Sequence, residues 1–97
     1  MEIYKQKINV LEETVFEAHT DKILTVELQH GGPVVYYIND RYKFPRPVKI
    51  HVWGAETGQS IYHHSGDYIN DPTYVKTILY YGDNYVVHYF YDIQGIF

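Results

Sequence analysis

The sequence predicts an all-β fold, a compact single-domain antiparallel sandwich or barrel of about six to seven strands over residues 1–97, without a substantial helix. Twelve of the 97 residues are tyrosine, and six of these lie between Tyr74 and Tyr91. Tyrosine favours strands because its ring packs on a half-buried sheet. Turn-forming residues recur about every eight to twelve positions. No segment keeps the 3.6-residue apolar period of a helix.

The first half of the chain divides into strands at its turn signals. We expect strands at 2–10 and 14–18, the second favoured over a helix by its β-branched residues. Residues 22–30 alternate apolar and polar side chains most clearly, which indicates a strand with one buried face. Gly31-Gly32 predicts a two-residue hairpin turn, because glycine permits the positive φ that such turns need. The return strand is expected at 34–38.

The second half begins with a loop. Two closely spaced prolines within 39–47 oppose strand pairing, and alternation resumes over Val48–Trp53, with His51 and Trp53 on the face opposite Ile50. Residues 54–72 hold three glycines and form the longest irregular stretch. Two long strands, 74–81 and 85–93, are expected to close the chain around a turn at 82–84.

Composition excludes several classes of function. The formal net charge is −4, from eight basic and twelve acidic residues, and a grip on long nucleic acid needs a basic surface. The absence of cysteine excludes disulfides and thiolate metal sites. The sequence shows no signal peptide and no apolar run of membrane-spanning length. We therefore expect a cytoplasmic protein that contacts neither a membrane nor long nucleic acid.

The histidines and serines do not form a recognisable catalytic or metal motif. His63 and His64 are adjacent, so on a strand they would point to opposite faces. His51 and His88 lie in expected strands and could approach this pair in space, which the sequence does not decide. Ser60 precedes the pair, but no nucleophile-elbow motif is present. We expect no catalytic residue, no metal and no cofactor, and a histidine-dependent hydrolase or phosphodiesterase ranks third among the functions.

Aromatic and basic residues concentrate in two loop regions, and this combination indicates a ligand. Rings can stack on a base or sugar, and arginine pairs with phosphate in a bidentate manner. The acidic total favours a small nucleotide over a polymer. The alternative is that these side chains only cover a small core. The expected ligand-binding residues are Arg41, Tyr42, Lys43, Arg46, Trp53, Thr57, Gly58, Tyr62, His63 and His64.

The last strand carries large apolar side chains on both faces. Such a strand is either central in a sandwich or covered by a partner. Tyrosine is enriched at protein interfaces, so we expect a homo-oligomer. The expected interface residues are Tyr80, Tyr85, Tyr89 and Tyr91.

Several short motifs of this chain resemble motifs found in a small group of phage-encoded proteins that share a domain of unknown function. They include Ile3-Tyr4-Lys5 at the start, Gly31-Gly32-Pro33 in the hairpin and Val87-His88-Tyr89-Phe90 near the end. The glycine turn near Gly54 differs from the family pattern by the inserted Ala55-Glu56. The resemblance implies a compact intracellular β-protein of phage origin and no known activity.

Two functions from different classes follow. The first is a non-enzymatic binder in phage counter-defence that sequesters a small cyclic nucleotide signal. The second is a structural or interaction module that docks a host protein through its tyrosine-rich sheet.

Overall fold

The computed structural model describes residues 1–63, 66, 71–81 and 85–95, and it confirms the all-β prediction. These residues form seven strands in two antiparallel sheets, which is a sandwich. The strands are β1 (Glu2–Lys7), β2 (Thr14–Ala18), β3 (Thr25–Gln29), β4 (Gly32–Asn39), β5 (Val48–Ala55), β6 (Thr73–Tyr80) and β7 (Tyr85–Gly95). None of the described residues belongs to a helix that could cross a membrane.

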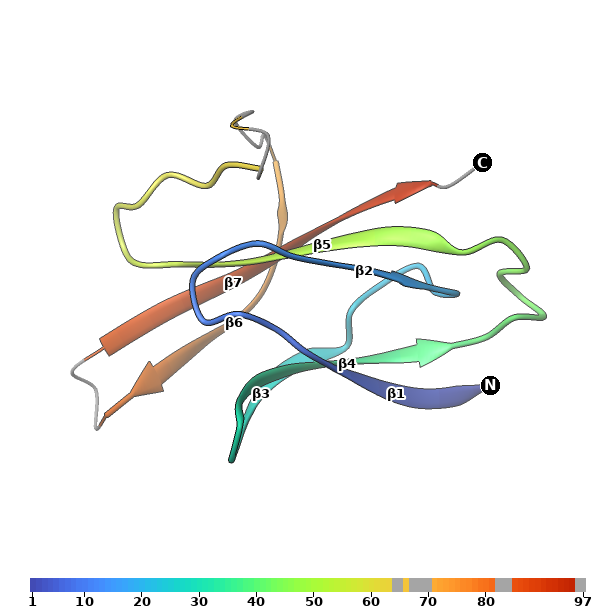
Figure 1. Ribbon diagram of the computed structural model, residues 1–97, viewed down its shortest axis with the longest axis horizontal. Helices are drawn as coiled ribbons and strands as arrows, with labels where there is room; N and C mark the ends of the chain where they lie inside the picture. The colour runs from blue at the N-terminus through green and yellow to red at the C-terminus, as the bar shows by residue number, and fades with distance from the viewer. Residues whose placement is uncertain (64–65, 67–70, 82–84, 96–97) are drawn as a thin grey trace.

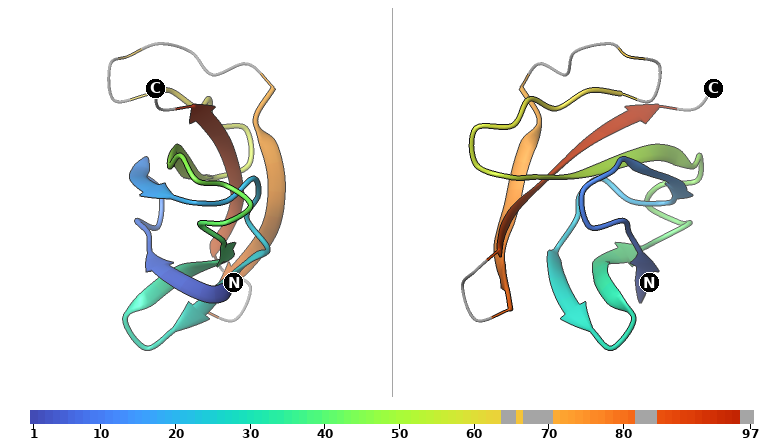
Figure 2. Two further views of the ribbon diagram at one scale, coloured as in Figure 1. Left: turned by 90° about the vertical axis from the view of Figure 1, so that its right-hand side faces the viewer. Right: turned by 60° about the vertical axis from the view of Figure 1, so that its left-hand side comes forward.

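The two sheets have the strand orders β1-β4-β3 and β2-β5-β7-β6. Figure 1 shows the four-stranded sheet above the three-stranded one, and the turned views in Figure 2 show the strongly twisted strands of both. β7 lies between β5 and β6, so the last strand is central in its sheet. Of the two explanations for its apolar faces, the central position is the one that the structure shows.

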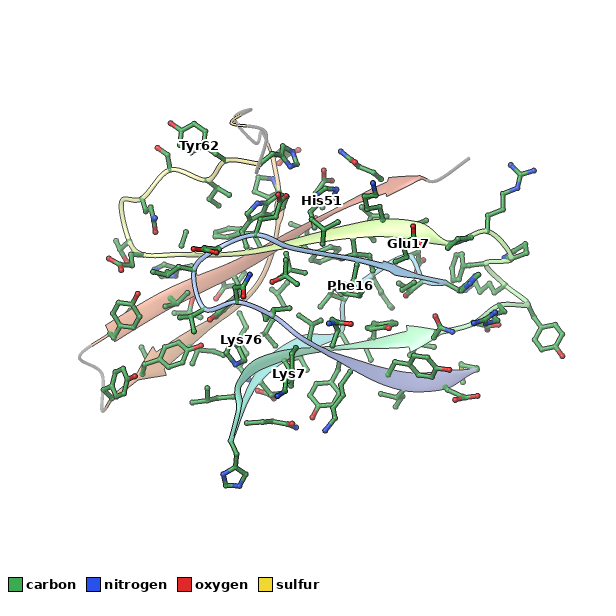
Figure 3. All side chains as sticks on the ribbon, in the orientation of Figure 1. Lys7, Phe16, Glu17, His51, Tyr62 and Lys76 are labelled. Atoms are coloured by element: carbon green, nitrogen blue, oxygen red, sulfur yellow. The ribbon has the colours of Figure 1, made fainter. Side chains whose placement is uncertain are left out.

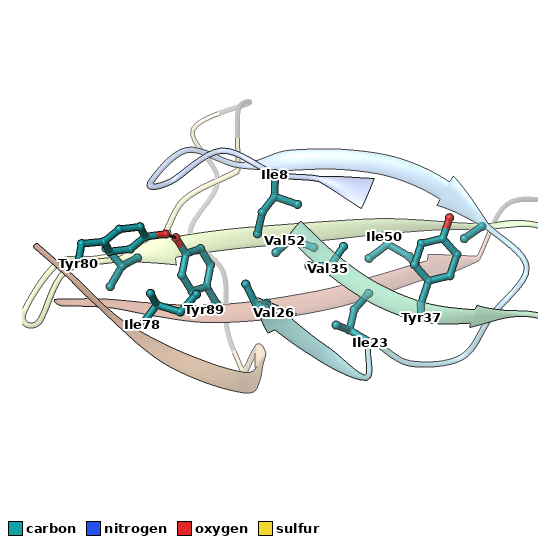
Figure 4. Close-up of a cluster of buried hydrophobic side chains, with 12 residues drawn as sticks. Ile8, Ile23, Val26, Val35, Tyr37, Ile50, Val52, Ile78, Tyr80 and Tyr89 are labelled. Atoms are coloured by element: carbon teal, nitrogen blue, oxygen red, sulfur yellow. Dashed lines mark hydrogen bonds between the residues drawn. The ribbon is translucent and has the colours of Figure 1, made fainter. Parts of the chain in front are cut away.

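The core lies between the sheets and follows from the two-residue period of the strands. Ile50 and Val52 of β5 point inward, as do Val87 and Tyr89 of β7, and each is at most 1 % exposed. Val26 and Val35 meet them from the three-stranded sheet. Figure 4 also shows Tyr80 and Tyr89 with their hydroxyl groups side by side at one end of this cluster.

Several strand boundaries differ from the sequence prediction. β4 is longer than the expected 34–38 at both ends, and β5 and β7 each extend two residues further than expected. β1 ends at Lys7. The backbone N–H of Ile8 still donates to the carbonyl oxygen of Pro33, and beyond it the chain crosses to the other sheet. β3 begins at Thr25, three residues later than expected. The pairing of Gln29 with Gly32 makes His30-Gly31 the hairpin turn in place of Gly31-Gly32. The expected turn at 82–84 lies outside the described residues.

Candidate functional site

The outer face of the four-stranded sheet holds the candidate site. His51 and Trp53 alternate with the inward-pointing Ile50 and Val52, so they face away from the core. They are nevertheless buried, with exposed fractions of 8 % and 2 %. The segment that follows β5 turns back along this face, and Figure 3 shows His51 and Tyr62 on the same side of the sheet. This face therefore carries a second buried cluster.

Glu13 is the centre of the cluster. It directly precedes β2, which pairs with β5 so that Thr14 lies opposite Val52. Its carboxylate is buried, and Oε2 lies 2.7 Å from Nδ1 of His51 and 3.0 Å from Nδ1 of His63. A buried carboxylate is stable only when it is paired or hydrogen-bonded. One acidic oxygen thus links three segments of the chain.

The second ring nitrogen of His51 is also engaged. Nε2 of His51 lies 3.1 Å from Oε1 of Gln94, near the end of β7. The amide group of Gln94 offers both an acceptor oxygen and a donor nitrogen, so it can bond to Nε2 whichever ring nitrogen of His51 carries the proton. Glu13 and Gln94 together therefore fix the orientation of the His51 ring.

Three aromatic rings pack together beside the carboxylate. The ring of His51 stacks on Trp53 with a centroid distance of 5.8 Å. His63 meets both rings edge-on, at 5.1 Å from His51 and 5.3 Å from Trp53. The indole Nε1 of Trp53 is buried and has no hydrogen-bond partner among the described residues. A buried donor without a partner lowers the stability of the fold by about 1–3 kcal/mol, so an acceptor bound at this atom would be stabilising.

A cavity of about 250 Å³ adjoins this cluster. Its wall combines apolar, aromatic and acidic groups with two polar side chains. The lining residues include Leu11, Glu12, Glu13, Trp53, Ser60 and Tyr62. A larger hollow of about 730 Å³ lies at the β3–β4 turn, but its lining includes neither a carboxylate nor a tyrosine or tryptophan.

A second polar group lies further along the same face. Nε2 of His88 is 2.7 Å from the hydroxyl of Thr57, and Nδ1 is 2.9 Å from that of Thr77. Tyr85 donates its hydroxyl to Glu56 at 2.9 Å. These contacts tie the segment after β5 to β6 and β7. Thr57 therefore has a bonding partner on the sheet, and Gly58 next to it has a positive φ of 84° that favours glycine.

The structure does not bring the expected ligand-binding residues together at one place. Trp53, Tyr62 and His63 meet at the site just described. The basic and aromatic residues of the β4–β5 loop lie at the other end of the molecule in Figure 1. These are Arg41, Tyr42, Lys43 and Arg46, all exposed. His64 lies outside the described residues.

The β4–β5 loop has its own local order. The carboxylate of Asp40 accepts the backbone N–H groups of Tyr42 and Lys43, each at 3.1 Å. These hydrogen bonds hold the pKa of Asp40 below its ordinary value, and the one from Lys43 has the largest effect. Arg41 lines a separate hollow together with Glu17 and Tyr37. The loop therefore does not share a pocket with Trp53.

The expected interface tyrosines are largely core residues. Tyr89 is fully buried and Tyr80 is 8 % exposed, and their hydroxyls bond to each other at 2.6 Å. Side chains inside a single folded chain are not available to a partner. Tyr85 and Tyr91 are half-buried and pack against the same core. The exposed apolar side chains on and next to β6 are instead Tyr74, Leu79 and Tyr81.

The sequence prediction missed Glu13 and Gln94. Glu13 falls between the expected strands 2–10 and 14–18. The signal that could have found it is the alternation of β2, which continues backwards from Val15 to Glu13 on one face. Gln94 lies beyond the predicted end of the last strand. Both residues meet His51 only because β5 lies between β2 and β7.

The fold and site together define an all-β sandwich with a buried glutamate–histidine cluster on the outer face of its larger sheet. A family model matches residues 1–95, and the chain belongs to that family, a domain of unknown function (DUF7352). The expected membership in a family of unknown function is thereby confirmed. No curated protein and no solved structure matches the chain.

Proposed function

We propose that this protein is a non-enzymatic binder of a small, planar, nitrogen-rich molecule of the nucleobase or nucleoside type, held in the cavity beside Trp53. The observation that carries the proposal is the buried indole Nε1 of Trp53, which lacks a hydrogen-bond partner among the described residues and belongs to a side chain that lines the cavity. A ring nitrogen or carbonyl oxygen of a ligand would satisfy this donor.

The remaining lining suits the same chemistry. The carboxylates of Glu12 and Glu13 accept hydrogen bonds, which fits the amino and ring N–H groups of a nucleobase. The rings of Trp53 and Tyr62 offer flat surfaces for stacking, which contributes about 1–3 kcal/mol per base in proteins that bind single strands. Drug-sized ligands occupy about 300–1,000 Å³, so a cavity of about 250 Å³ favours a smaller molecule.

The cavity disfavours phosphate. Two carboxylates in its wall repel an anion, and the exposed basic residues of the β4–β5 loop lie at the other end of the molecule. We therefore narrow the expected nucleotide ligand to its base, with any phosphate outside the cavity. Phage origin, counter-defence and sequestration of a cyclic nucleotide stay predictions, and we place the binder in that role on the resemblance alone.

Calorimetric titration with adenine, guanine, cytosine, uracil, their nucleosides and the matching cyclic nucleotides tests the proposal. We expect at least one nucleobase or nucleoside to bind, and more tightly than its phosphorylated form. Trp53→Phe keeps a ring but removes the N–H donor, so it should weaken binding by about tenfold, the value of one hydrogen bond. Arg41→Ala, in the distant loop, is the matched control and should bind as the wild type does.

Two outcomes would reject the proposal. Silence across the whole panel would remove the nucleobase ligand. Equal affinity of Trp53→Phe and wild type would remove the cavity as its site. Chromatography of the recovered ligand separates binding from chemistry, because a converted ligand would favour the histidine-dependent hydrolase.

A further inference from the structure

We propose that Glu13, His51 and His63 form a binding site for a divalent transition-metal ion, with Zn²⁺ as the expected occupant. This proposal does not rest on the nucleobase ligand, although Glu13 both lines the cavity and supplies a candidate metal-ligand atom. The three candidate ligand atoms lie within 4.8 Å of one another and come from three separate segments of the chain. Two imidazoles and one carboxylate are the ligands of many catalytic zinc sites.

The spacing of the ligand atoms fits a tetrahedral ion with little movement. Bonds of about 2.0–2.2 Å to nitrogen and oxygen place neighbouring ligand atoms roughly 3.3 Å apart in a tetrahedron. Oε2 of Glu13 lies 2.7 Å and 3.0 Å from the two Nδ1 atoms. To bind the ion, Oε2 of Glu13 and each Nδ1 atom therefore have to move apart by only a few tenths of an ångström. Three protein ligands leave a fourth position for water.

The contact between His51 and Gln94 is a second observation that points to a metal. A metal-bound histidine usually donates its other ring N–H to an oxygen, which fixes the tautomer and the ring orientation. Oε1 of Gln94 lies 3.1 Å from Nε2 of His51 and can accept such a proton. A metal ion on Nδ1 would replace the proton that Nδ1 donates to Glu13, and the ring would then carry its proton on Nε2, next to Gln94.

The surroundings of the cluster add to its suitability. Glu13 and His51 are buried at 5 % and 8 % exposure. A dication compensates the cost of a buried carboxylate more strongly than two neutral N–H donors can. His63 is less buried, with 21 % of its side chain exposed, so the ion has an entry path. The indole of Trp53 packs against both imidazoles and holds their rings in place.

The donor set also predicts selectivity. Imidazole suits zinc, copper, nickel and cobalt, whereas magnesium and calcium prefer sites made of oxygen ligands. We therefore expect Zn²⁺ and Co²⁺ to bind to the apo protein and Mg²⁺ and Ca²⁺ to leave it unchanged.

Titration of the chelator-treated full chain with Zn²⁺ and Co²⁺ tests the site. Trp53 is the single tryptophan of the chain and contacts both imidazoles, so its fluorescence should change with stoichiometric Zn²⁺. Bound Co²⁺ should give the visible absorption of a low-coordinate nitrogen and oxygen site. His63→Asn should weaken Zn²⁺ binding by at least about tenfold, and Glu13→Gln should do the same.

The matched control is His30→Asn, which removes an exposed histidine from the β3–β4 turn. It should keep the wild-type affinity for Zn²⁺. His63 belongs to an irregular segment, so His63→Asn should fold, and its circular dichroism and unfolding midpoint verify this. Absence of stoichiometric Zn²⁺ binding, or equal binding by folded His63→Asn and wild type, would overturn the proposal.

The two proposals can fail separately. Trp53→Phe retains all three metal ligands, so it should bind Zn²⁺, measured by calorimetry, while losing affinity for the nucleobase. A protein that binds Zn²⁺ but no member of the nucleobase panel would support the metal site alone. Binding of a nucleobase by His63→Asn without any response to Zn²⁺ would support the cavity alone.

Discussion

Glu13 and His51 are 38 residues apart in the chain, and Oε2 of the first lies 2.7 Å from Nδ1 of the second on the outer face of the larger sheet. Both side chains are buried, although this face is opposite the core. The contact joins the residue before β2 to the middle of β5. It therefore ties an edge strand to its neighbour by a side-chain bond in addition to the backbone ladder.

Removal of this carboxylate should destabilise the apo protein. Glu13→Ala leaves the buried Nδ1–H of His51 without its acceptor, which costs about 1–3 kcal/mol in the free energy of unfolding. Urea unfolding in the presence of a chelator measures the loss without a contribution from metal. Glu12→Ala changes the exposed neighbour and should stay within about 0.5 kcal/mol of wild type. Equal midpoints for both variants would contradict the structural role of Glu13.

Gly54 of β5 lies directly against the backbone of the segment between β1 and β2. A Cβ atom there would lie 2.0 Å from the carbonyl oxygen of Val10 and 2.9 Å from side-chain atoms of Val87 and Tyr89. Because backbone and core must shift together, Gly54→Ala should cost about 3 kcal/mol or more. In Gly31→Ala the new Cβ meets only the end of the flexible Lys7 side chain. Chemical unfolding of both variants, with a clearly larger loss for Gly54→Ala, is the expected result.

Local sequence patterns predicted the fold class and much of the strand content. β2 has the predicted bounds, because its β-branched residues alternate in a short strand. The alternation of β5 placed His51 and Trp53 on one face, as the structure shows. The predicted strand boundaries were wrong where pairing with neighbouring strands decides them. The alternation also mispredicts burial at one position. Leu28 of β3 follows the apolar alternation but is 51 % exposed, since it lies near the end of an edge strand.

The candidate site was not predictable from local patterns. Glu13, His51 and His63 meet only because the sheet order places β2 beside β5 and because the segment after β5 turns back over it. Alternation fixes the face of a side chain but not its neighbour across the sheet. The same limitation explains why Arg41 and Trp53 were expected to share one ligand, although they lie in different hollows.

Self-association stays a prediction, but its test needs a surface residue. Leu79 is 53 % exposed on edge strand β6, and Tyr81 beside it is 83 % exposed. If a second copy covers this face, the wild type should scatter light as a dimer at about micromolar concentration, and Leu79→Asp should be monomeric, because a buried unpaired charge is costly. Tyr42→Asp, in the distant loop, should remain dimeric. A monomeric wild type would end the expectation.

The hydroxyl pair of Tyr80 and Tyr89 should show strong coupling. The two oxygens lie 2.6 Å apart within the core. Tyr89→Phe leaves the hydroxyl of Tyr80 unsatisfied and should cost about 1–3 kcal/mol, whereas the double variant with Tyr80→Phe removes both polar groups. The double variant should therefore lose less stability than the sum of the single losses. Additive losses in urea unfolding would show that the two hydroxyls do not depend on each other.

The same pair predicts a loss of stability at high pH. Burial raises the pKa of Tyr89 far above its ordinary value of 10.0, and burial also raises that of Tyr80. Above about pH 10 the unfolded chain releases these protons while the folded chain retains them, so the unfolded state binds fewer protons. The free energy of unfolding should therefore be unaffected by these groups below pH 10 and fall above it. For Tyr89 the slope approaches about 1.4 kcal/mol per pH unit.

Urea unfolding at a series of pH values between about 8 and 11 measures this slope around the ordinary tyrosine pKa. The double variant Tyr80→Phe/Tyr89→Phe removes both groups and should lose stability less steeply above pH 10. Tyr42→Phe is the control, because Tyr42 is 96 % exposed and its replacement should leave the slope unchanged. Phenolate absorption adds an independent signal, since the two buried hydroxyls should ionise only as the chain unfolds. Parallel slopes for the double variant and the wild type would show that these tyrosines titrate freely in the folded protein.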